Sequence, residues 1–159
     1  MNRRLWTFLA IGATVTAAVV VVGVSLTRGS SSPSTPIRVA GHAALVDAQG
    51  VAVEGLDAVQ QDIAAGALVL DVRKDDEWSA GRVAGSMHIP LTEVQDRTAE
   101  LPKGRTIVTV CKDGGRSYKA AYALRQAGYD AVNLDGGLTA WAAAGLPLVD
   151  NTGAPGHIG

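Results

Sequence analysis

Cysteine is almost absent from this sequence. Only Cys111 occurs among the 159 residues, so the chain cannot form an internal disulfide and its fold must rest on a hydrophobic core. The three histidines, His42, His88 and His157, are far apart and lack the spacing of metal ligands. The sequence therefore predicts no metal site and no cofactor, and the single thiol is either an inert buried side chain or a functional one.

The chain also lacks an excess of charge of either sign. It carries 14 basic and 15 acidic residues, and no basic run follows Arg4. A nucleic-acid partner is therefore not expected, because binding to a phosphate backbone needs clustered positive charge. The length suits a short membrane or export segment followed by one compact domain.

Charge is missing altogether from Leu5 to Leu26, an apolar stretch of 22 residues. As a helix it would reach about 33 Å, roughly the thickness of the hydrocarbon core of a bilayer. Residues 1–28 are therefore predicted to be an N-terminal transmembrane anchor, with residues 5–26 in the membrane; a cleaved signal segment is the alternative. Arg3 and Arg4 precede the span, which predicts a domain on the extracytoplasmic side, in a periplasm or at the cell surface, or a secreted domain after cleavage.

The composition changes after the apolar stretch. Residues 29–49 are rich in Ser, Pro and Gly and are predicted to be a linker, although the stretch IRVAGHAALVDAQG within and after it also fits a first strand. From residue 50 to residue 150, strand-like and helix-like patterns alternate. This predicts a three-layer α/β/α domain with about five short, mainly parallel strands. Residues 151–159 are predicted to be a flexible tail.

Two kinds of pattern give the expected elements within this domain. Short apolar runs predict strands at 67–73, 86–90, 106–111 and 131–137. Helical spacing of apolar residues predicts helices at 56–66, 75–81, 91–101, 117–128 and 138–145.

Cys111 lies where the 106–111 strand ends and a loop leads into the next predicted helix. In parallel α/β folds, functional groups gather at the carboxyl ends of the strands. Gly114 and Gly115 would let the backbone curl so that N–H groups point at the sulfur, beside the positive end of the helix. These groups would favour the thiolate, the nucleophilic form of cysteine.

Charged residues flank the same cysteine. Lys112 and Arg116 add positive charge that would also stabilise the thiolate, whereas Asp113 opposes it unless it points to solvent. Ser117 could donate one more hydrogen bond to the sulfur.

The motif CKDGGRS, with LVLDVRKDDEWSAGRVAGSMHIP before it and NLDGGLTAW after it, resembles a rhodanese domain of the sulfurtransferase family. The three blocks occur in order over most of residues 67–141. The resemblance implies that Cys111 takes sulfane sulfur from a small anionic donor such as thiosulfate and holds it as a persulfide. The sulfur then passes to a thiol or cyanide-like acceptor, or to a sulfur-accepting protein, and Arg116 is the second catalytic residue.

The resemblance gives weaker roles to residues outside the loop. Asp71 and Arg73 are expected to fix neighbouring loops through an ion pair or hydrogen bonds, and Glu77 is expected to be structural. Arg82 is expected near the mouth of the site, in contact with an anionic donor or simply solvated. The substrate-binding set is therefore Lys112, Asp113, Gly114, Gly115, Ser117 and Arg82.

Two alternatives of other classes remain open at the level of the sequence. Cysteine phosphatases and arsenate reductases place five residues between their cysteine and arginine, whereas four separate Cys111 from Arg116, a loop that suits a sulfur atom better than a phosphate. A membrane-tethered sulfur carrier or protein-docking module would use the same loop without turnover of a small substrate.

Overall fold

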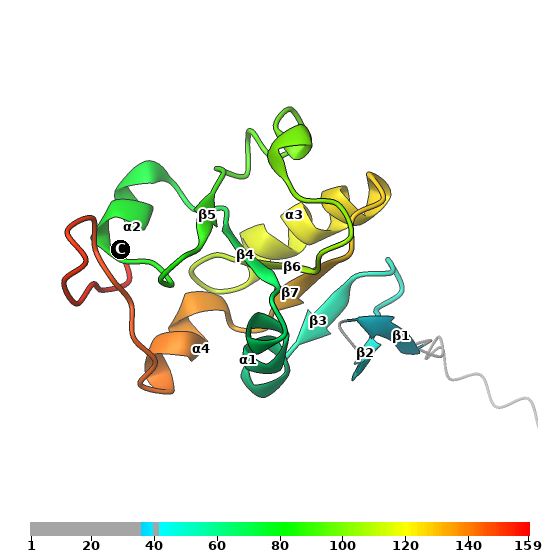
Figure 1. Ribbon diagram of the computed structural model, residues 1–159, viewed down its shortest axis with the longest axis horizontal. Coiled ribbons are helices and arrows are strands. Elements are labelled where there is room, and N and C mark those ends of the chain that lie inside the picture. The colour runs from blue at the N-terminus through cyan, green and yellow to red at the C-terminus, as the bar shows by residue number, and fades with distance from the viewer. Residues whose placement is uncertain (1–35, 40–41) are drawn as a thin grey trace, which may run out of the picture. The chain divides into compact units, whose positions relative to one another are not determined.

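The computed structural model describes residues 36–39 and 42–159; the predicted anchor and residues 29–35, 40 and 41 of the predicted linker lie outside this part (Figure 1). No helix within the described ranges has the length and apolar character needed to cross a bilayer. The elements, in chain order, are β1 (Pro36–Val39), β2 (His42–Leu45), β3 (Ala52–Glu54), α1 (Leu56–Ala64), β4 (Leu68–Asp71), α2 (Asp75–Ala80), β5 (Met87–His88), the 3-10 helix η1 (Thr98–Glu100), β6 (Ile107–Val110), α3 (Gly115–Gln126), β7 (Ala131–Leu134) and α4 (Gly137–Ala143).

The central sheet has five strands in the order β3-β7-β6-β4-β5, and every neighbouring pair is parallel. The predicted α/β class and the number of strands are therefore confirmed. β1 and β2 pair with each other as an antiparallel hairpin. The stretch that the sequence left ambiguous between strand and linker thus forms strands, and its last residues lead to β3 through a bridge between Val46 and Ala52.

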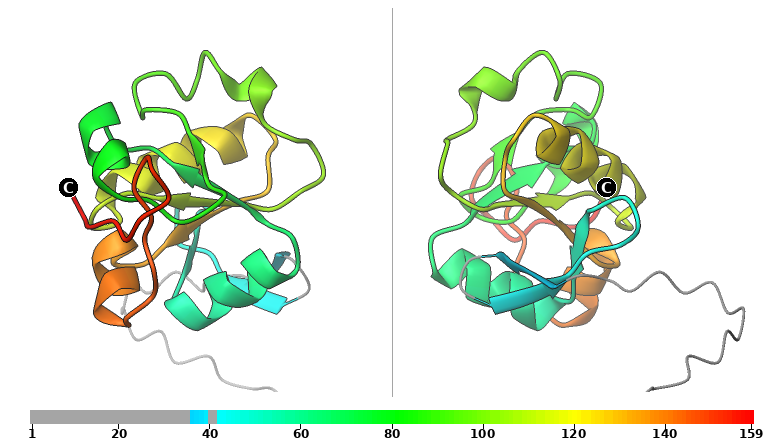
Figure 2. Two further views of the ribbon diagram at one scale, coloured as in Figure 1. Left: turned by 60° about the vertical axis from the view of Figure 1, so that its left-hand side comes forward. Right: turned by 90° about the vertical axis from the view of Figure 1, so that its right-hand side faces the viewer.

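Helices cover both faces of the sheet and complete the three layers (Figures 1 and 2). α1 and α4 pack on one face, where Val59 and Leu138 meet strand residues such as Val108. α3 packs on the other face, where Leu124 meets Ile107. Because side chains alternate along a strand, β6 sends Val108 toward α1 and α4 and sends Ile107 and the following Cys111 toward α3.

The helix predicted for residues 91–101 is wrong. This segment is a series of turns, with bonds such as Glu93 N to Pro90 O, and only η1 is helical. Its first residue, Leu91, donates its N–H to Val72 O and so continues alongside β4 instead of starting a helix. Val94 and Leu101 are buried, so their helix-like spacing reflects two contacts with the core rather than one helical face.

The segment 151–159, expected to be a flexible tail, packs against the domain beside α2 (Figures 1 and 2). Arg82 and Val149 exchange two backbone hydrogen bonds of 2.9 Å just before it, and His157 N donates to Ala80 O at 3.1 Å. The composition of this segment gave no sign of these contacts, because they are made by its backbone.

The turn before α4 holds the loop after β6 in place. Gly137 has a φ of +55°, and a Cβ built on it would lie 2.5 Å from Cys111 O and 2.8 Å from Gly114 N. Both are backbone atoms and cannot swing away. The first N–H groups of α4 meet the loop's carbonyls, with Leu138 N donating to Cys111 O at 2.8 Å and Thr139 N to Lys112 O at 2.9 Å. The loop conformation therefore depends on Gly137, the first residue of α4.

This contact predicts that Gly137→Ala lowers the free energy of unfolding by about 2–4 kcal/mol, because the new methyl group overlaps backbone on a left-handed residue. Gly128→Ala is the matched control, since Gly128 also has a positive φ, +79°, but has open space around its Cα. Gly128→Ala should lower the free energy of unfolding by only about 1–2 kcal/mol, because alanine is disfavoured in the left-handed conformation. Urea denaturation measures both, and equal losses for the two variants would contradict the close packing.

Candidate active site

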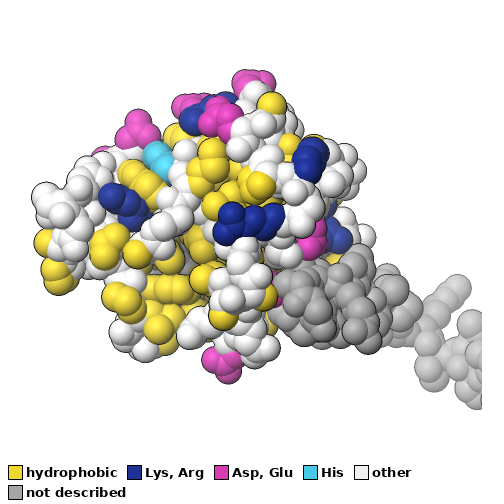
Figure 3. All heavy atoms as spheres, viewed as in Figure 1, with side chains coloured by type: hydrophobic (Ala, Val, Ile, Leu, Met, Phe, Trp, Pro, Cys, Tyr) yellow, Lys and Arg dark blue, Asp and Glu magenta, His cyan; other side chains and the backbone are white. Residues whose placement is uncertain are grey.

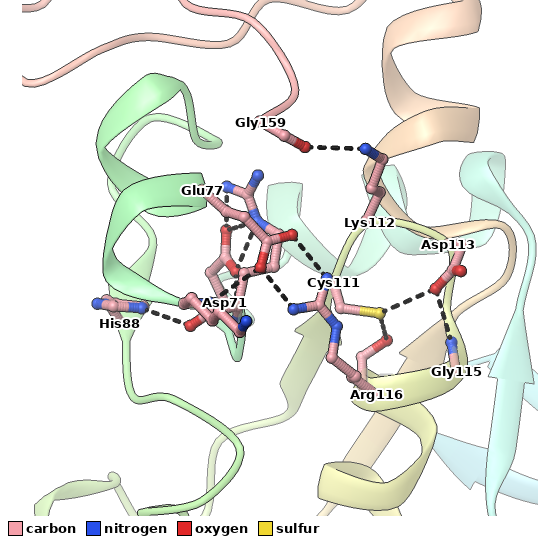
Figure 4. Close-up of polar contacts among 12 residues, drawn as sticks. Asp71, Glu77, His88, Cys111, Lys112, Asp113, Gly115, Arg116 and Gly159 are labelled. Atoms are coloured by element: carbon pink, nitrogen blue, oxygen red, sulfur yellow. Dashed lines mark hydrogen bonds and ion pairs between the residues drawn. The ribbon is translucent and has the colours of Figure 1, made fainter.

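Cys111 lies at the carboxyl end of β6, and its side chain is fully buried on the α3 side of the sheet. The loop that follows folds back so that Gly114 N donates a hydrogen bond to Sγ at 3.2 Å. Gly114 makes this possible because its φ is +94°, a conformation that favours glycine. The curled backbone expected from the glycines is therefore present around the sulfur (Figure 4).

Ser117, in the first turn of α3, provides a second donor. Its Oγ lies 3.4 Å from Cys111 Sγ and 3.1 Å from Gly114 O, so its proton can be donated to the sulfur or to the loop's carbonyl. The side chain is fully buried, which keeps water from competing for that proton. An anion on the sulfur would therefore find two hydrogen-bond donors already in position.

The carboxylate of Asp113 also faces Cys111 Sγ, and its negative charge opposes the stabilising effect of these two donors. Its Oδ1 is 3.7 Å from Cys111 Sγ and 3.4 Å from Gly115 N (Figure 4). A thiol can donate its proton to this carboxylate, whereas a thiolate would be repelled by it. Although Asp113 is an exposed residue, its Oδ1 faces the sulfur, and the loop therefore contains one group that opposes negative charge on Cys111.

Arg116, which was expected to be the second catalytic residue, forms its ion pair with α2. Its guanidinium forms a two-pronged pair with Glu77 of α2, with N–O distances of 2.6 and 2.7 Å. Hydrogen bonding from Arg116 lowers the pKa of Glu77 from 4.5 to about 2, and the same pair raises the pKa of Arg116. Arg116 thus joins the loop to α2, and Glu77 largely neutralises its charge.

Lys112 and Arg82 also make contacts away from the sulfur. Lys112 Nζ donates to Gly159 O at 3.0 Å, so its ammonium group lies against the last residues of the chain (Figure 4). Arg82 lies over the ring of Trp78 at 4.7 Å and donates to Asn151 Oδ1 at 2.8 Å. Neither cation has a contact with Cys111, so the expected placement of Arg82 at the mouth finds no support in its contacts.

Asp71 and Arg73, which were expected to fix neighbouring loops, form a fully buried ion pair. Arg73 Nε lies 3.0 Å from both carboxylate oxygens of Asp71, and Arg73 Nη2 lies 2.7 Å from Oδ2. Arg73 Nη2 also donates to Gly81 O at 2.6 Å. This pair fixes the chain after β4 to the end of α2, and so holds the helix that carries Glu77.

The sequence gave no signal for a further support, His88. Its Nε2 lies 2.8 Å from Arg73 O, and its ring stacks on Trp78 at 4.7 Å with an interplanar angle of 9°. This stacking joins Trp78 of α2 to His88 of β5, and their separation in the sequence matches neither helix nor strand periodicity. The contact could therefore not be predicted from a single sequence. Within residues 46–159, no group of three or more His, Cys, Asp or Glu side chains is arranged to hold a metal ion.

The Glu77–Arg116 pair predicts a pH-dependent contribution to stability. Because folding depresses the pKa of Glu77 from 4.5 to about 2, the contribution is complete above about pH 4.5 and is lost as the pH falls toward 2. Glu77→Gln should lower the free energy of unfolding at pH 7 by about 1–2 kcal/mol, discounted for partial exposure to water. The difference from the natural protein should shrink between pH 4.5 and 2 in thermal melts.

The control for this pair is Glu93→Gln, because Glu93 pairs with Arg97 while half exposed to solvent. That variant should cost about 0.5 kcal/mol or less. A loss for Glu77→Gln that persists unchanged at pH 2 would contradict the ionic origin of its contribution.

Known proteins resemble this chain in both sequence and structure. It is 41% identical over 83 residues to a sulfurtransferase of Allochromatium vinosum, a match that covers 52% of this chain and 78% of that protein. It is 36% identical over 74 residues to a putative sulfur carrier protein of Bacillus subtilis, covering 46% of this chain and 40% of that protein. A rhodanese-related protein from Thermoplasma volcanium shares 30% identity with a TM-score of 0.58, covering 61% of this chain and 96% of that one. These names support sulfur transfer in general.

The model of the rhodanese-like domain matches residues 55–144, which is more than half of the chain. The match includes β4, the Cys111 loop and α4, the segments that form the site described above. This chain therefore belongs to the family of rhodanese-like domains.

Proposed function

We propose that this protein is a sulfurtransferase that moves sulfane sulfur from a small anionic donor, such as thiosulfate, to a thiophilic acceptor through a persulfide on Cys111. The observation that carries the proposal is the position of Cys111 Sγ, which accepts a hydrogen bond from Gly114 N at 3.2 Å and lies 3.4 Å from the hydroxyl of Ser117. Preorganised donors of this kind stabilise negative charge on sulfur throughout a reaction.

Two displacement steps account for the activity. In the first, the Cys111 thiolate attacks the outer sulfur of thiosulfate; the new S–S bond forms as the bond to the sulfonate breaks, and sulfite leaves with the electron pair. In the second, a thiolate or cyanide attacks the outer sulfur of the persulfide, and the electron pair of the broken bond returns to Cys111. No change in net oxidation state is needed, so the cycle requires neither a redox cofactor nor a metal.

The donors around the sulfur serve both steps. The sulfur bears negative charge before the first step and regains it in the second, and a persulfide between them is also an anion near neutral pH. Gly114 N is a backbone group and Ser117 Oγ belongs to a buried side chain, and both already lie near the sulfur. The site therefore need not rearrange as negative charge develops on the sulfur. Arg116, paired with Glu77, supports the shape of the loop rather than contributing a free charge.

A carrier that exchanges sulfur with a partner protein is the second candidate. One observation favours it: Cys111 is fully buried, and Lys112 and Arg116, the cations of its loop, are engaged by Gly159 O and Glu77. Within the described part of the chain, no cation contacts the sulfur to capture a small anion. Turnover of thiosulfate by the isolated protein distinguishes an enzyme from a carrier that accepts sulfur only from its partner.

The proposal predicts that thiosulfate adds about 32 Da to the protein, one sulfur atom on Cys111, as read by intact-mass spectrometry. Cys111→Ser should abolish the adduct and all sulfur transfer. Because serine is smaller and tolerates the same donors, the variant should keep a cooperative unfolding transition. A natural protein that gains no sulfur from thiosulfate, polysulfide or any other sulfane donor would contradict the persulfide mechanism.

A second prediction concerns Asp113, whose carboxylate opposes charge on the sulfur. Asp113→Asn should speed both alkylation of Cys111 by iodoacetamide and persulfide formation at pH 7, by about fivefold, because a carboxylate about 4 Å from the sulfur costs about 1 kcal/mol when exposed to water. Asp96→Asn is the control, since Asp96 is exposed in the turns before η1. A slower reaction in the Asp113 variant would instead assign its carboxylate the role of a base.

We propose also that residues 5–26 anchor the protein in a membrane and hold the domain on the extracytoplasmic side. The proposal rests on the length of the uncharged stretch and on Arg3 and Arg4 before it. Protease added to intact cells or spheroplasts should digest the domain and leave a membrane-bound N-terminal fragment. A domain that is protected until the cells are lysed would contradict this orientation, and a domain released without its first residues would indicate cleavage.

A further inference from the structure

Thr109 is a polar residue within a buried apolar strand. β6 has the sequence IVTV, all of its residues are buried, and Thr109 is fully so. Valine has nearly the same shape as threonine and would fill this position without burying a hydroxyl, which costs free energy unless it is hydrogen-bonded. The hydroxyl therefore serves a purpose other than filling the core.

The hydroxyl of Thr109 lies between two carbonyl groups from different elements. Its Oγ1 is 3.0 Å from Val132 O in β7 and 3.0 Å from Ser117 O in the first turn of α3. Its single proton is shared between these two acceptors. The contact links the sheet to the first turn of α3, at the residue whose own hydroxyl lies 3.4 Å from Cys111 Sγ.

The first turn of α3 has few other means of support. Its N-cap residue is Gly114, so no side chain caps the helix. Ser117 Oγ lies 3.4 Å from Cys111 Sγ and 3.1 Å from Gly114 O, and its one proton is donated to one or the other. A small shift of the turn would therefore change which acceptor receives the proton. Thr109 lies two residues before the cysteine, and since alternate side chains along a strand share a face, both lie on the α3 side of the sheet.

Surface charge offers no substitute for internal donors on the face that Figure 3 shows. Lys and Arg groups lie there among Asp and Glu groups and hydrophobic side chains, without a broad patch of one sign. Near the sulfur, Asp113 Oδ1 opposes negative charge from 3.7 Å, and Arg116 is paired with Glu77. Stabilisation of a charged sulfur therefore depends closely on the placement of Gly114 N and Ser117 Oγ.

We propose that Thr109 is a positioning residue for the sulfur site, and that its hydroxyl holds the first turn of α3 so that Ser117 Oγ stays within reach of Cys111 Sγ. The inference rests on the proposed function, in which the Ser117 hydroxyl is one of two donors to the charged sulfur. Thr109 acts through Ser117 and not on the sulfur itself. Without its hydroxyl the turn can shift, and the proton of Ser117 is donated to Gly114 O instead. Less thiolate is then present at a given pH.

Alkylation of Cys111 by iodoacetamide, followed against pH in the full chain, tests this role because it reads the thiolate without sulfur transfer. Thr109→Val should move the midpoint of the profile upward by about 0.5 pH unit and slow alkylation below the midpoint about threefold. The plateau rate above the midpoint should stay the same. Asp113 and Arg116 keep their charges in this variant. A changed plateau with an unmoved midpoint would show that the cysteine has only become more or less accessible, and would overturn the proposal.

Thr109→Ser is the conservative variant, because it keeps the hydroxyl and loses one buried methyl group. It should retain the midpoint of the natural protein but unfold at a lower temperature. Thr109→Val keeps the shape of the side chain and should unfold at a higher temperature than Thr109→Ser, yet show the shifted midpoint. A midpoint that follows the unfolding temperature across the two variants would mean that Thr109 is merely structural.

Thr106→Val is the matched control, because Thr106 lies just before β6 and its Oγ1 donates to Asp130 Oδ2 at 2.9 Å, at the other end of the strand. This variant also exchanges a buried threonine for valine and should leave the midpoint unchanged. Ser117→Ala removes the hydroxyl that Thr109 positions, so in that background Thr109→Val should cause no further shift. An equal shift with and without the Ser117 hydroxyl would refute the coupling.

Sulfur loading separates this inference from the proposed function. A natural protein that gains no sulfur from thiosulfate, while its alkylation still depends on Thr109 through Ser117, would contradict the proposed function but leave the positioning role. Loading that succeeds while Thr109→Val keeps the natural midpoint would overturn this inference alone.

Discussion

The packing of the Cys111 loop against the turn before α4 is the constraint on which the site depends. Gly137 has no side chain, so the backbone of the two segments meets at a distance that any Cβ would forbid. The first N–H groups of α4 then donate hydrogen bonds to Cys111 O and Lys112 O, and the hydroxyl of Thr139 donates a second one to Lys112 O. This leaves Gly114 N free to turn toward the sulfur.

The side-chain charges around the site are used mainly for structure. Arg116 binds Glu77, Arg73 binds Asp71, and Lys112 donates to a backbone carbonyl. These contacts tie the loop, α2 and the end of the described chain together. The groups that contact the sulfur are the Gly114 N–H and the hydroxyl of Ser117, opposed by Asp113, and Arg116 interacts with it only electrostatically. Dipoles held in place by the fold, rather than free cations, are therefore the means by which this site would stabilise a charged sulfur.

The sequence was sufficient for the architecture because its strands are short apolar runs and its helices have clear spacing, as in 106–111 and 117–128. It failed for 91–101, where apolar residues at helical intervals serve separate contacts. The sequence pattern also predicted that Cys111 lies between the end of a strand and the start of a helix, as it does between β6 and α3. The direction of the Arg116 side chain could not be predicted, because its pairing with Glu77 depends on where α2 lies in space. The packing of 151–159 rests on backbone contacts, which leave no trace in residue types.

The Gly114 N–H donates a hydrogen bond to Cys111 Sγ, and we expect this bond to become stronger as the sulfur becomes charged. The amide proton signal of Gly114 in ¹⁵N-labelled protein measures it most directly, followed as Cys111 ionises with pH and again as it is loaded with sulfur. We expect the Gly114 proton signal to move downfield in both experiments, by more than that of Gly115, and to show no such movement in Cys111→Ser. A Gly114 signal that stays in place while the sulfur ionises and reacts would show that this N–H does not stabilise the charged sulfur.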